Sequence, residues 1–248
     1  MPDSGAWRLL SLGETDPYRN MALEEALLEA VEEAAPSTLR LWRNTRSVVI
    51  GWSQRPEEVL NLENCRRFGV SVVRRFTGGG AVYQDLGNLN WTLACRRDMP
   101  PLRRGMTARQ VFKRLSSPIL EALRELGLEA EFNPPNAIYL EGGKVSGMAM
   151  YIKRRSLLCH GTLLVDSDLN LLRLTLRRLK DPVTNLREEI PSLTMEEVIN
   201  SIIRAFEDQL SIKLIKGGLS TLEEELLERH PPQRYDALRG RESYKKGG

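Results

Sequence analysis

The sequence predicts an α+β fold in which a mixed, largely antiparallel sheet is flanked by helices. Short β-branched or alternating segments follow one another in hairpin order through the middle of the chain. Segments of helical periodicity lie between these strands and after them, and glycine or proline marks many of the boundaries. Strands and helices in this order are typical of a sheet with one or more helical layers.

The N-terminal third begins with a predicted helix. Asp16 suits the N-cap, Pro17 suits the first helical position, and apolar residues then recur at helical spacing up to Val31. Residues 37–44 and 47–52 are predicted strands. Residues 56–69 form a predicted short helix that ends at a glycine, the residue best suited to a C-terminal cap.

Further strands and helices follow in alternation. The predicted strands cover residues 70–76, 81–86 and 89–96, and several strands between residues 137 and 166 are joined by a tight turn at 141–143. The predicted helices cover residues 107–127, 169–179, 195–210 and 222–229. We expect a single domain over residues 1–248, in which residues 181–248 form a linker and a short helical C-terminal portion, with 179–192 as the best linker candidate.

Composition excludes several classes of protein. The 248 residues contain no apolar run near the ~20 needed to span a membrane, and the first ten residues lack a signal peptide pattern, so we expect a cytoplasmic protein without a membrane partner. The net charge of +3 is dispersed and indicates no nucleic-acid partner. Cys65, Cys95 and Cys159 lack metal-site spacing, so no metal bound directly by the protein is expected.

The stretch VVRRFTGGGAVYQDLGNLNWTLA places three glycines directly after a strand and two arginines. Glycines 78–80 allow the backbone to approach a ligand closely and to present N–H groups to an anion. Arg74 and Arg75 point to opposite faces of their strand, so we expect one to enter a site while the other faces solvent or pairs elsewhere. A glycine-rich hairpin with two surface arginines is the alternative, and the spacing leaves the ligand open.

A second segment, EGGKVSGMAM, places Lys144 directly after a tight turn and among small residues. A lysine in this setting can reach into a cleft and stabilise developing negative charge. The alternative is a turn lysine surrounded by solvent.

Six motifs in the same order resemble the lipoate–protein ligase A family, of the biotin/lipoate A/B protein ligase superfamily. The resemblance runs from about Asn20 to Arg187 and rests on NMALEEALL, VVIGWSQ, RRFTGGGAVYQDLGNLNWTL, NAIYLEGGKVSGMA, CHGTLLVDSDL and PVTNLRE. It implies the catalytic fold of biotin and lipoate ligases, which is class II synthetase-like, without a separate accessory domain. It also implies ATP and Mg²⁺ as cofactors, lipoate or octanoate as substrate, and an acyl-AMP that is transferred to a lysine of a carrier domain.

The resemblance also implies roles for individual residues. Lys144 is the expected catalytic residue, bridging the carboxyl and phosphate oxygens, and Arg75 is expected to contact the nucleotide or its phosphate. The other expected ATP- and lipoate-binding residues are Gly78, Gly79, Gly80, Ala81, Val82 and Tyr83. A second tier comprises Arg74, Gln84, Asp85, Asn90, Asn136, Ser146, Gly147, His160 and Thr162.

Two positions depart from the family pattern. Gln84 stands where many members have histidine, and Asn136-Ala137 stands where many have Asn-Asp, which removes a carboxylate that could affect the position of metal or nucleotide. The expected partners are lipoyl-carrier domains of 2-oxoacid dehydrogenase complexes or the glycine cleavage H protein. A small accessory ligase subunit is a further expected partner, in which case this chain is the large subunit of a bipartite ligase.

Three other functions remain open at the level of sequence. An ATP-independent octanoyl or lipoyl acyltransferase is the main alternative, although the cysteine that such enzymes use near the Asn136 segment is missing. A biotin ligase would have a different arginine–glycine loop. A non-catalytic scaffold would have no need of Lys144.

Overall fold

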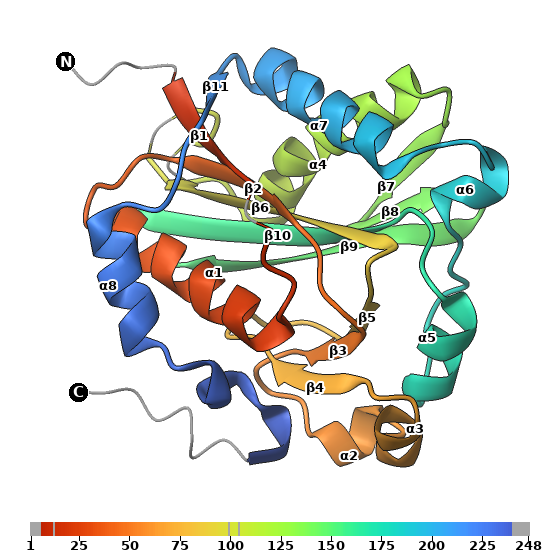
Figure 1. Cartoon of the computed structure of the whole chain (residues 1–248). Helices are drawn as coiled ribbons and strands as arrows, with labels where there is room; N and C mark the ends of the chain where they lie inside the picture. Colours follow the sequence, from red (N-terminus) through yellow and green to blue (C-terminus); the bar gives the residue numbers. More distant parts are fainter. Residues whose placement is uncertain (1–5, 12, 99, 104, 240–248) are drawn as a thin grey trace.

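The computed structural model describes residues 6–11, 13–98, 100–103 and 105–239. At its centre is an eight-stranded mixed sheet, with a three-stranded sheet beside it (Figure 1). The strand order of the large sheet is β11 (Lys213–Lys216), β1 (Ala6–Leu10), β2 (Thr38–Trp42), β6 (Asn88–Arg96), β10 (Ser156–Leu164), β9 (Gly143–Ile152), β8 (Ala137–Leu140) and β7 (Ala130–Asn133). The small sheet has the order β4 (Ser71–Arg74), β3 (Ser47–Ile50) and β5 (Val82–Gln84).

Pairing in the large sheet is mostly antiparallel, which confirms the predicted fold class. β1 runs parallel to both of its neighbours, and the remaining pairs, from β2 to β7, are antiparallel. In the small sheet β3 pairs parallel with β4 and antiparallel with β5.

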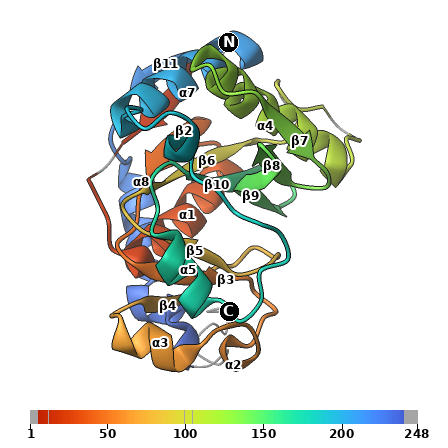
Figure 2. The ribbon, with the colours of Figure 1, turned by 90° about the vertical axis from the view of Figure 1, so that its right-hand side faces the viewer.

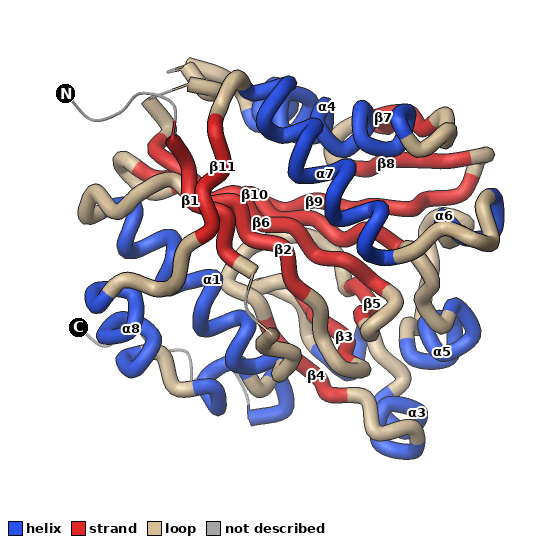
Figure 3. The backbone as a smooth tube through the Cα atoms, turned by 45° about the horizontal axis from the view of Figure 1, so that its top comes forward, coloured by secondary structure: helices blue, strands red, loops and turns tan. Residues whose placement is uncertain are grey.

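Helices cover both faces of the large sheet (Figure 3). One face is covered by α1 (Pro17–Glu32), which packs against α8 (Thr221–Arg229), and the other by α4 (Ala108–Glu125) and α7 (Met195–Leu210). The shorter helices are α2 (Pro56–Val59), α3 (Leu62–Arg67), α5 (Leu169–Thr175) and α6 (Leu186–Glu189), followed near the C-terminus by the 3₁₀ helices η1 (Pro232–Tyr235) and η2 (Ala237–Arg239). Figure 2 shows α2, α3 and α5 around the small sheet. Among the described residues, no helix is both long enough and apolar enough to span a lipid bilayer.

The paired strands β6 and β10 form the centre of the core because both of their faces are covered. On β6, Trp91 and Leu93 face the α4–α7 layer, while Ala94 faces α1. On β10, Cys159 belongs to the α4–α7 cluster, and burial raises the pKa of its thiol. The alternation of strand side chains therefore separates Cys159 from the next residue, His160.

Several elements differ from the predictions. The predicted 56–69 helix is two helices, because Leu60 forms a bridge with Leu176 and Asn61 caps the second helix by accepting from the Asn64 N–H. The helix predicted over 169–179 ends at Thr175. Three strands were not predicted because they have only four or five residues each: β1, β7 and β11. In addition, β11 pairs with β1 at the opposite end of the chain, which no local pattern indicates.

Residues 181–239, expected to form a linker and a short helical portion, contribute a strand and two helices to the main fold. Within residues 181–239, β11 extends the large sheet beside β1, α7 covers one face of that sheet, and α8 packs on α1. Residues 240–248 of the same expectation lie outside the described residues.

A buried ion pair joins α1 to the sheet. Arg40 on β2 and Glu24 on α1 are both fully buried, and the Arg40 guanidinium donates to Glu24 Oε1 at 3.0 Å. The second carboxylate oxygen accepts from the Thr92 hydroxyl at 2.7 Å. Because both charges have lost their water, each depends on the other for compensation.

Replacing Glu24 by alanine should therefore lower the free energy of unfolding by about 3–5 kcal/mol, because it leaves the Arg40 charge buried without an anion. Urea denaturation measures this loss. The matched control is Glu58→Ala, which removes an exposed partner of Arg55 and should cost about 0.5 kcal/mol or less. Equal losses in the two variants would contradict the role of the buried pair.

A second ionic cluster fastens the C-terminal segment to α1. Glu29 on α1 contacts His230, at the end of α8, with 2.9 Å between the carboxylate oxygen and Nε2. The Lys153 ammonium donates to the other oxygen at 3.0 Å. These contacts, the one to His230 foremost, hold the pKa of Glu29 at about 2, against an ordinary value of 4.5.

This depressed pKa predicts loss of stability in acid. The contribution of Glu29 is complete above its unfolded-state pKa of 4.5 and is lost as the pH falls through its folded-state value of about 2. The difference in unfolding free energy between the wild type and Glu29→Gln should therefore shrink across that window. Glu57→Gln, an exposed change on α2, serves as the control and should leave the pH profile unaltered. A wild-type advantage over Glu29→Gln that is constant with pH would refute the assignment.

Candidate active site

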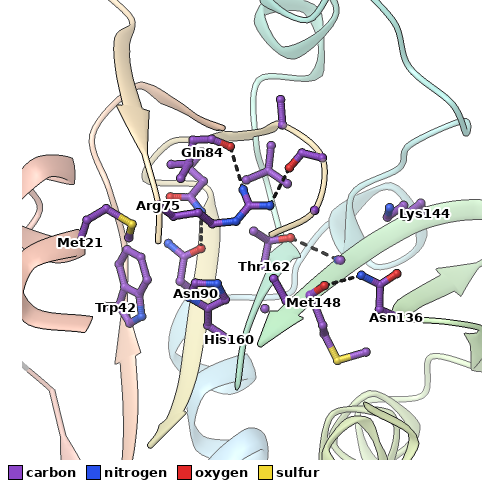
Figure 4. Close-up of a pocket in the computed structure, with 18 residues that line it drawn as sticks. Met21, Trp42, Arg75, Gln84, Asn90, Asn136, Lys144, Met148, His160 and Thr162 are labelled. Atoms are coloured by element: carbon purple, nitrogen blue, oxygen red, sulfur yellow. Dashed lines mark hydrogen bonds between the residues drawn. The ribbon is translucent and has the colours of Figure 1, made fainter. Parts of the chain in front are cut away.

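A pocket of about 100 Å³ lies where the loop of glycines 78–80, here called the glycine loop, meets strand β9 and the central strands β6 and β10 (Figure 4). Its lining combines cations, amides and apolar side chains. The lining residues are Met21, Trp42, Val49, Arg75, Gly79, Gly80, Ala81, Val82, Gln84, Asn90, Asn136, Lys144, Gly147, Met148, Ala149, His160, Gly161 and Thr162.

The structure brings most of the predicted site residues into this one pocket. Lys144 and the bend at Gly79–Gly80 share it, although they lie more than 60 residues apart. Arg75, Ala81 and Val82 line it too, as do six of the second-tier residues: Gln84, Asn90, Asn136, Gly147, His160 and Thr162.

The pocket does not include five of the predicted residues: Gly78, Tyr83, Arg74, Asp85 and Ser146. The Tyr83 side chain lies outside the pocket for a geometric reason, and its contact with a ligand stays a prediction. On β5 the side chains alternate, so Val82 and Gln84 face the pocket while Tyr83 packs on the other side. The Asp85 side chain binds backbone groups instead, and its carboxylate accepts from the N–H groups of Gly87 and Asp168 at 2.9 Å each.

Arg74 is buried and pairs away from the pocket. Its guanidinium donates to the carbonyl oxygens of Gly51 at 3.3 Å, Trp52 at 2.9 Å and Gln54 at 2.7 Å. The arginine outside the site was expected either to face solvent or to pair elsewhere, and Arg74 pairs elsewhere. Arg74 fixes the turn at residues 51–54, which lies against the glycine loop.

Arg75 hydrogen-bonds to the backbone of the glycine loop. Its guanidinium donates to the carbonyl oxygens of Val49 at 3.0 Å, Gly78 at 2.7 Å and Gly80 at 2.8 Å, and its Nε donates to the Thr77 hydroxyl at 3.0 Å. It is 6% exposed, and burial lowers its pKa to about 10. These bonds give Arg75 a structural task in shaping the loop, and its contact with a phosphate stays a prediction.

Glycine is required at the point where the two loops meet. Gly79 has φ of +97°, a conformation that a side chain would strain. A Cβ on Gly51 would overlap the carbonyl oxygen of Gly79. The turn at residues 51–54 and the glycine loop can therefore pack against each other, backbone to backbone.

Lys144 stands at the start of β9, beside an irregularity in the β8–β9 pairing. Its side chain lies over Gly147, and 4.0 Å separates its Nζ from the Asp181 carboxylate. Burial lowers the pKa of the Lys144 ammonium, and the neighbouring Asp181 opposes that shift.

His160 connects the pocket to the buried ion pair of α1. Its Nδ1 lies 3.0 Å from Glu24 Oε2 and its Nε2 lies 2.9 Å from the Thr77 hydroxyl. Because a carboxylate only accepts, Nδ1 carries a hydrogen and donates it to Glu24. The Thr77 oxygen in turn accepts from Arg75. A continuous chain of hydrogen bonds thus runs from α1 to the glycine loop.

The residues that line the pocket suit an anion and offer no carboxylate to a metal ion. Arg75 and Lys144 contribute two positive charges, and the lining contains neither aspartate nor glutamate. Asn136 donates its amide N–H to the Met148 carbonyl. Since Mg²⁺ prefers carboxylate oxygen ligands, this donor set does not fit an ion bound directly by the protein.

Sequence reasoning missed the apolar wall of the pocket, which comprises Met21, Trp42, Val49, Met148, Ala149 and Gly161. In sequence these residues are indistinguishable from core residues, because each continues the periodicity of its helix or strand. The Trp42 indole N–H donates to Thr92 at 2.9 Å, so the ring is held in place.

Comparison with known proteins identifies the family of the chain. The family model of the lipoyl protein ligase A/B catalytic domain matches residues 16–207, a range that contains every residue lining the pocket. The chain belongs to this family. Lipoate-protein ligase LplJ of Bacillus subtilis is a relative with 34% identity, covering 68% of this chain and 48% of that protein. Octanoyltransferase LipM of Halalkalibacterium halodurans is 30% identical and covers 93% of this chain and 96% of that protein. The chain spans about half the length of the first curated relatives that it matches.

Solved structures of the family show the same fold. A bipartite lipoate protein ligase of Thermoplasma acidophilum, studied with its E2 lipoyl domain, has a TM-score of 0.86 at 26% identity and covers 98% of this chain and 100% of that chain. A lipoate-protein ligase A bound with ATP has a TM-score of 0.82 at 29% identity, covering 90% and 93%. Biotin protein ligase of Aquifex aeolicus shares the fold at 18% identity and a TM-score of 0.50, with 82% of this chain and 70% of that chain covered.

Proposed function

We propose that this chain is the catalytic part of an ATP-dependent lipoate–protein ligase. It activates lipoate or octanoate as an acyl-AMP and transfers the acyl group to a lysine of a lipoyl-carrier domain. The observation that carries this proposal is a pocket with two cations, no carboxylate and an apolar wall. Such a pocket suits a molecule with an anionic head and an apolar tail.

The first step brings together two groups that repel each other. The carboxylate oxygen of the acid attacks the α-phosphorus of ATP, an O–P bond forms, and the bond to pyrophosphate breaks. Lys144 lines the pocket and is partly exposed, so its ammonium can offset negative charge on both groups. The glycine loop contributes backbone N–H groups that no Cβ shields.

In the second step the amine of the carrier lysine attacks the acyl carbon. The C–O bond to AMP breaks, an amide forms, and the amine loses a proton. Lys144 stabilises the negative charge that remains on the departing phosphate. Mg²⁺ would enter on the phosphate oxygens of ATP, since the pocket lining supplies no carboxylate for it.

The proposed partners follow from the Thermoplasma acidophilum system, whose bipartite ligase was studied with an E2 lipoyl domain. We propose that this chain acts on lipoyl domains of 2-oxoacid dehydrogenase complexes or on the glycine cleavage H protein. We further propose that a small accessory subunit is needed for adenylation.

An ATP-independent acyltransferase is the second candidate, because the octanoyltransferase relative covers nearly the whole chain. Such a transfer through a thioester needs a reactive cysteine at the pocket. Among the residues that line the pocket there is none, and Cys65, Cys95 and Cys159 are all buried in apolar clusters.

The deciding experiment incubates the purified chain and a candidate small accessory subunit with a lipoyl-carrier domain and lipoate, with or without ATP. Mass spectrometry of the carrier should show acylation of one lysine only when ATP is present, and AMP and pyrophosphate should appear. Acylation from an octanoylated carrier without ATP would instead support the acyltransferase. Omitting the accessory subunit tests its role, because adenylation at the full rate by this chain alone would contradict the proposed need for it.

A further inference from the structure

A segment far along the chain is built in beside Lys144. The Lys144 N–H donates to the Pro182 carbonyl at 2.8 Å, and the Thr184 N–H donates to the Lys144 carbonyl at 3.3 Å. Lys144 and Val183 form a parallel bridge. Residues 182–184 therefore lie along Lys144 as a short additional strand, which places Asp181 next to its side chain.

Two glycines make this arrangement possible. A Cβ on Gly143 would lie 2.7 Å from Thr184 Cγ2, so glycine lets the 182–184 segment approach β9. A Cβ on Gly147 would lie 3.3 Å from Lys144 Cε and 3.5 Å from Nζ, so glycine lets the lysine side chain lie across β9. The two glycines therefore let the 182–184 segment and the Lys144 side chain both pack closely against β9.

The charges around Lys144 are few and of both signs. Asp181 lies 4.0 Å from Nζ, with the two side chains 39% and 33% exposed, and Lys180 acts on the ammonium as a like charge. On β8, Tyr139 lies close to Asp181, and burial together with that carboxylate raises the pKa of its phenol. Arg75 and His160 line the same pocket.

We propose that Asp181 is a positioning residue for Lys144, holding its ammonium charged and at the pocket until the acid and the nucleotide replace this carboxylate as its anionic partners. The inference rests on the proposed function, in which Lys144 stabilises the activated acid. A carboxylate at 4.0 Å, partly in water, attracts the ammonium without binding it tightly. Such a partner can be exchanged for a substrate anion at little cost.

The neighbouring charges have opposite effects on the proton of Lys144. Burial lowers the pKa of the ammonium, Asp181 raises it, and Lys180 lowers it. Removing the Asp181 charge should therefore let Lys144 lose its proton at lower pH. Removing the Lys180 charge should let it keep its proton to higher pH.

The test uses two pairs of variants of the full chain: Asp181→Asn with Asp181→Glu, and Lys180→Gln with Lys180→Arg. Acyl-AMP formation is measured from pH 6 to about 10, and the reactivity of the Lys144 amine toward an acylating reagent is measured without substrate by peptide mass spectrometry. Asp181→Asn should move the alkaline fall in activity, and the onset of amine reactivity, to lower pH. In the falling limb its rate should be about two- to fivefold below wild type, as expected of a partly exposed pair.

Lys180→Gln should move both curves to higher pH, and the two charge-conserving variants should follow wild type. High salt should reduce the difference between Asp181→Asn and wild type, because screening weakens exposed pairs. Equal pH profiles for wild type, Asp181→Asn and Lys180→Gln would overturn the inference. A loss of rate in Asp181→Asn that is uniform with pH, with a lowered melting temperature, would also overturn it, since that indicates only a structural contact.

Failure of this inference can be distinguished from failure of the proposed function. If wild type forms no acyl-AMP under any condition, the proposed function fails, and the amine-reactivity curves still test the inference. If wild type is active and the curves coincide, the inference fails while the proposed function stands.

Discussion

Replacing Lys144 by alanine should lower the rate of acyl-AMP formation by at least about 10²–10³-fold, the loss typical of removing one group that stabilises developing negative charge. The fold should be retained, because the side chain is 33% exposed and its ion pair with Asp181 lies at 4.0 Å in partial contact with water. Pyrophosphate release measures the rate, and thermal melting measures the fold.

The controls separate charge from shape. Lys144→Met keeps most of the side-chain volume and should be as inactive as the alanine variant. Lys213→Ala removes an exposed lysine from the edge strand β11, far from the pocket, and should retain wild-type activity. Carrier modification at the wild-type rate by Lys144→Ala would contradict the catalytic role proposed for Lys144.

Replacing Arg75 by alanine should have a comparably large effect for a different reason. The change removes the donors that hold the carbonyl oxygens of Val49, Gly78 and Gly80, so the glycine loop loses its shape. We expect acyl-AMP formation to fall by about 10²-fold or more, because misplaced backbone donors no longer meet the reacting atoms. We also expect a loss of about 1–3 kcal/mol in unfolding free energy from unpaired buried carbonyls.

Arg75→Lys is the informative companion variant. It keeps the charge and loses the planar fork that reaches several carbonyls at once. We expect it to resemble alanine in activity, because the task of Arg75 is to shape the loop. The control Arg55→Ala removes an arginine that is 67% exposed and close in sequence, and should change neither property. A fully active Arg75→Lys would show that charge alone matters at this position.

Much of the fold could be predicted because its signals are local. Asp16 caps α1, the glycines after α3 and α4 have positive φ, and the period of two marks the strands that cross the core. The strands that escaped prediction lack such signals. β11, for example, is only four residues long and exposes Ile215, and its stability comes from pairing with β1 at the other end of the chain.

Some residues of the candidate site could likewise be predicted from the motifs, and the placement of others could not. The resemblance of the motifs picked out Lys144, Gly79 and Gly80, and the structure brings them to one pocket. It did not separate Tyr83 from Val82, nor assign Arg74 to the turn at residues 51–54, because both depend on which face of a strand meets which neighbour.

By itself, the sequence determined the α+β class, the caps and turns, and the presence of a glycine loop and a lysine turn, because these depend on residues adjacent in the chain. Only the tertiary structure decided that Arg75 clamps the loop, that His160 joins it to Glu24, and that Asp181 stands beside Lys144. Those contacts join segments separated by up to 136 residues, and their geometry is set by strand register and backbone packing, which no local pattern encodes.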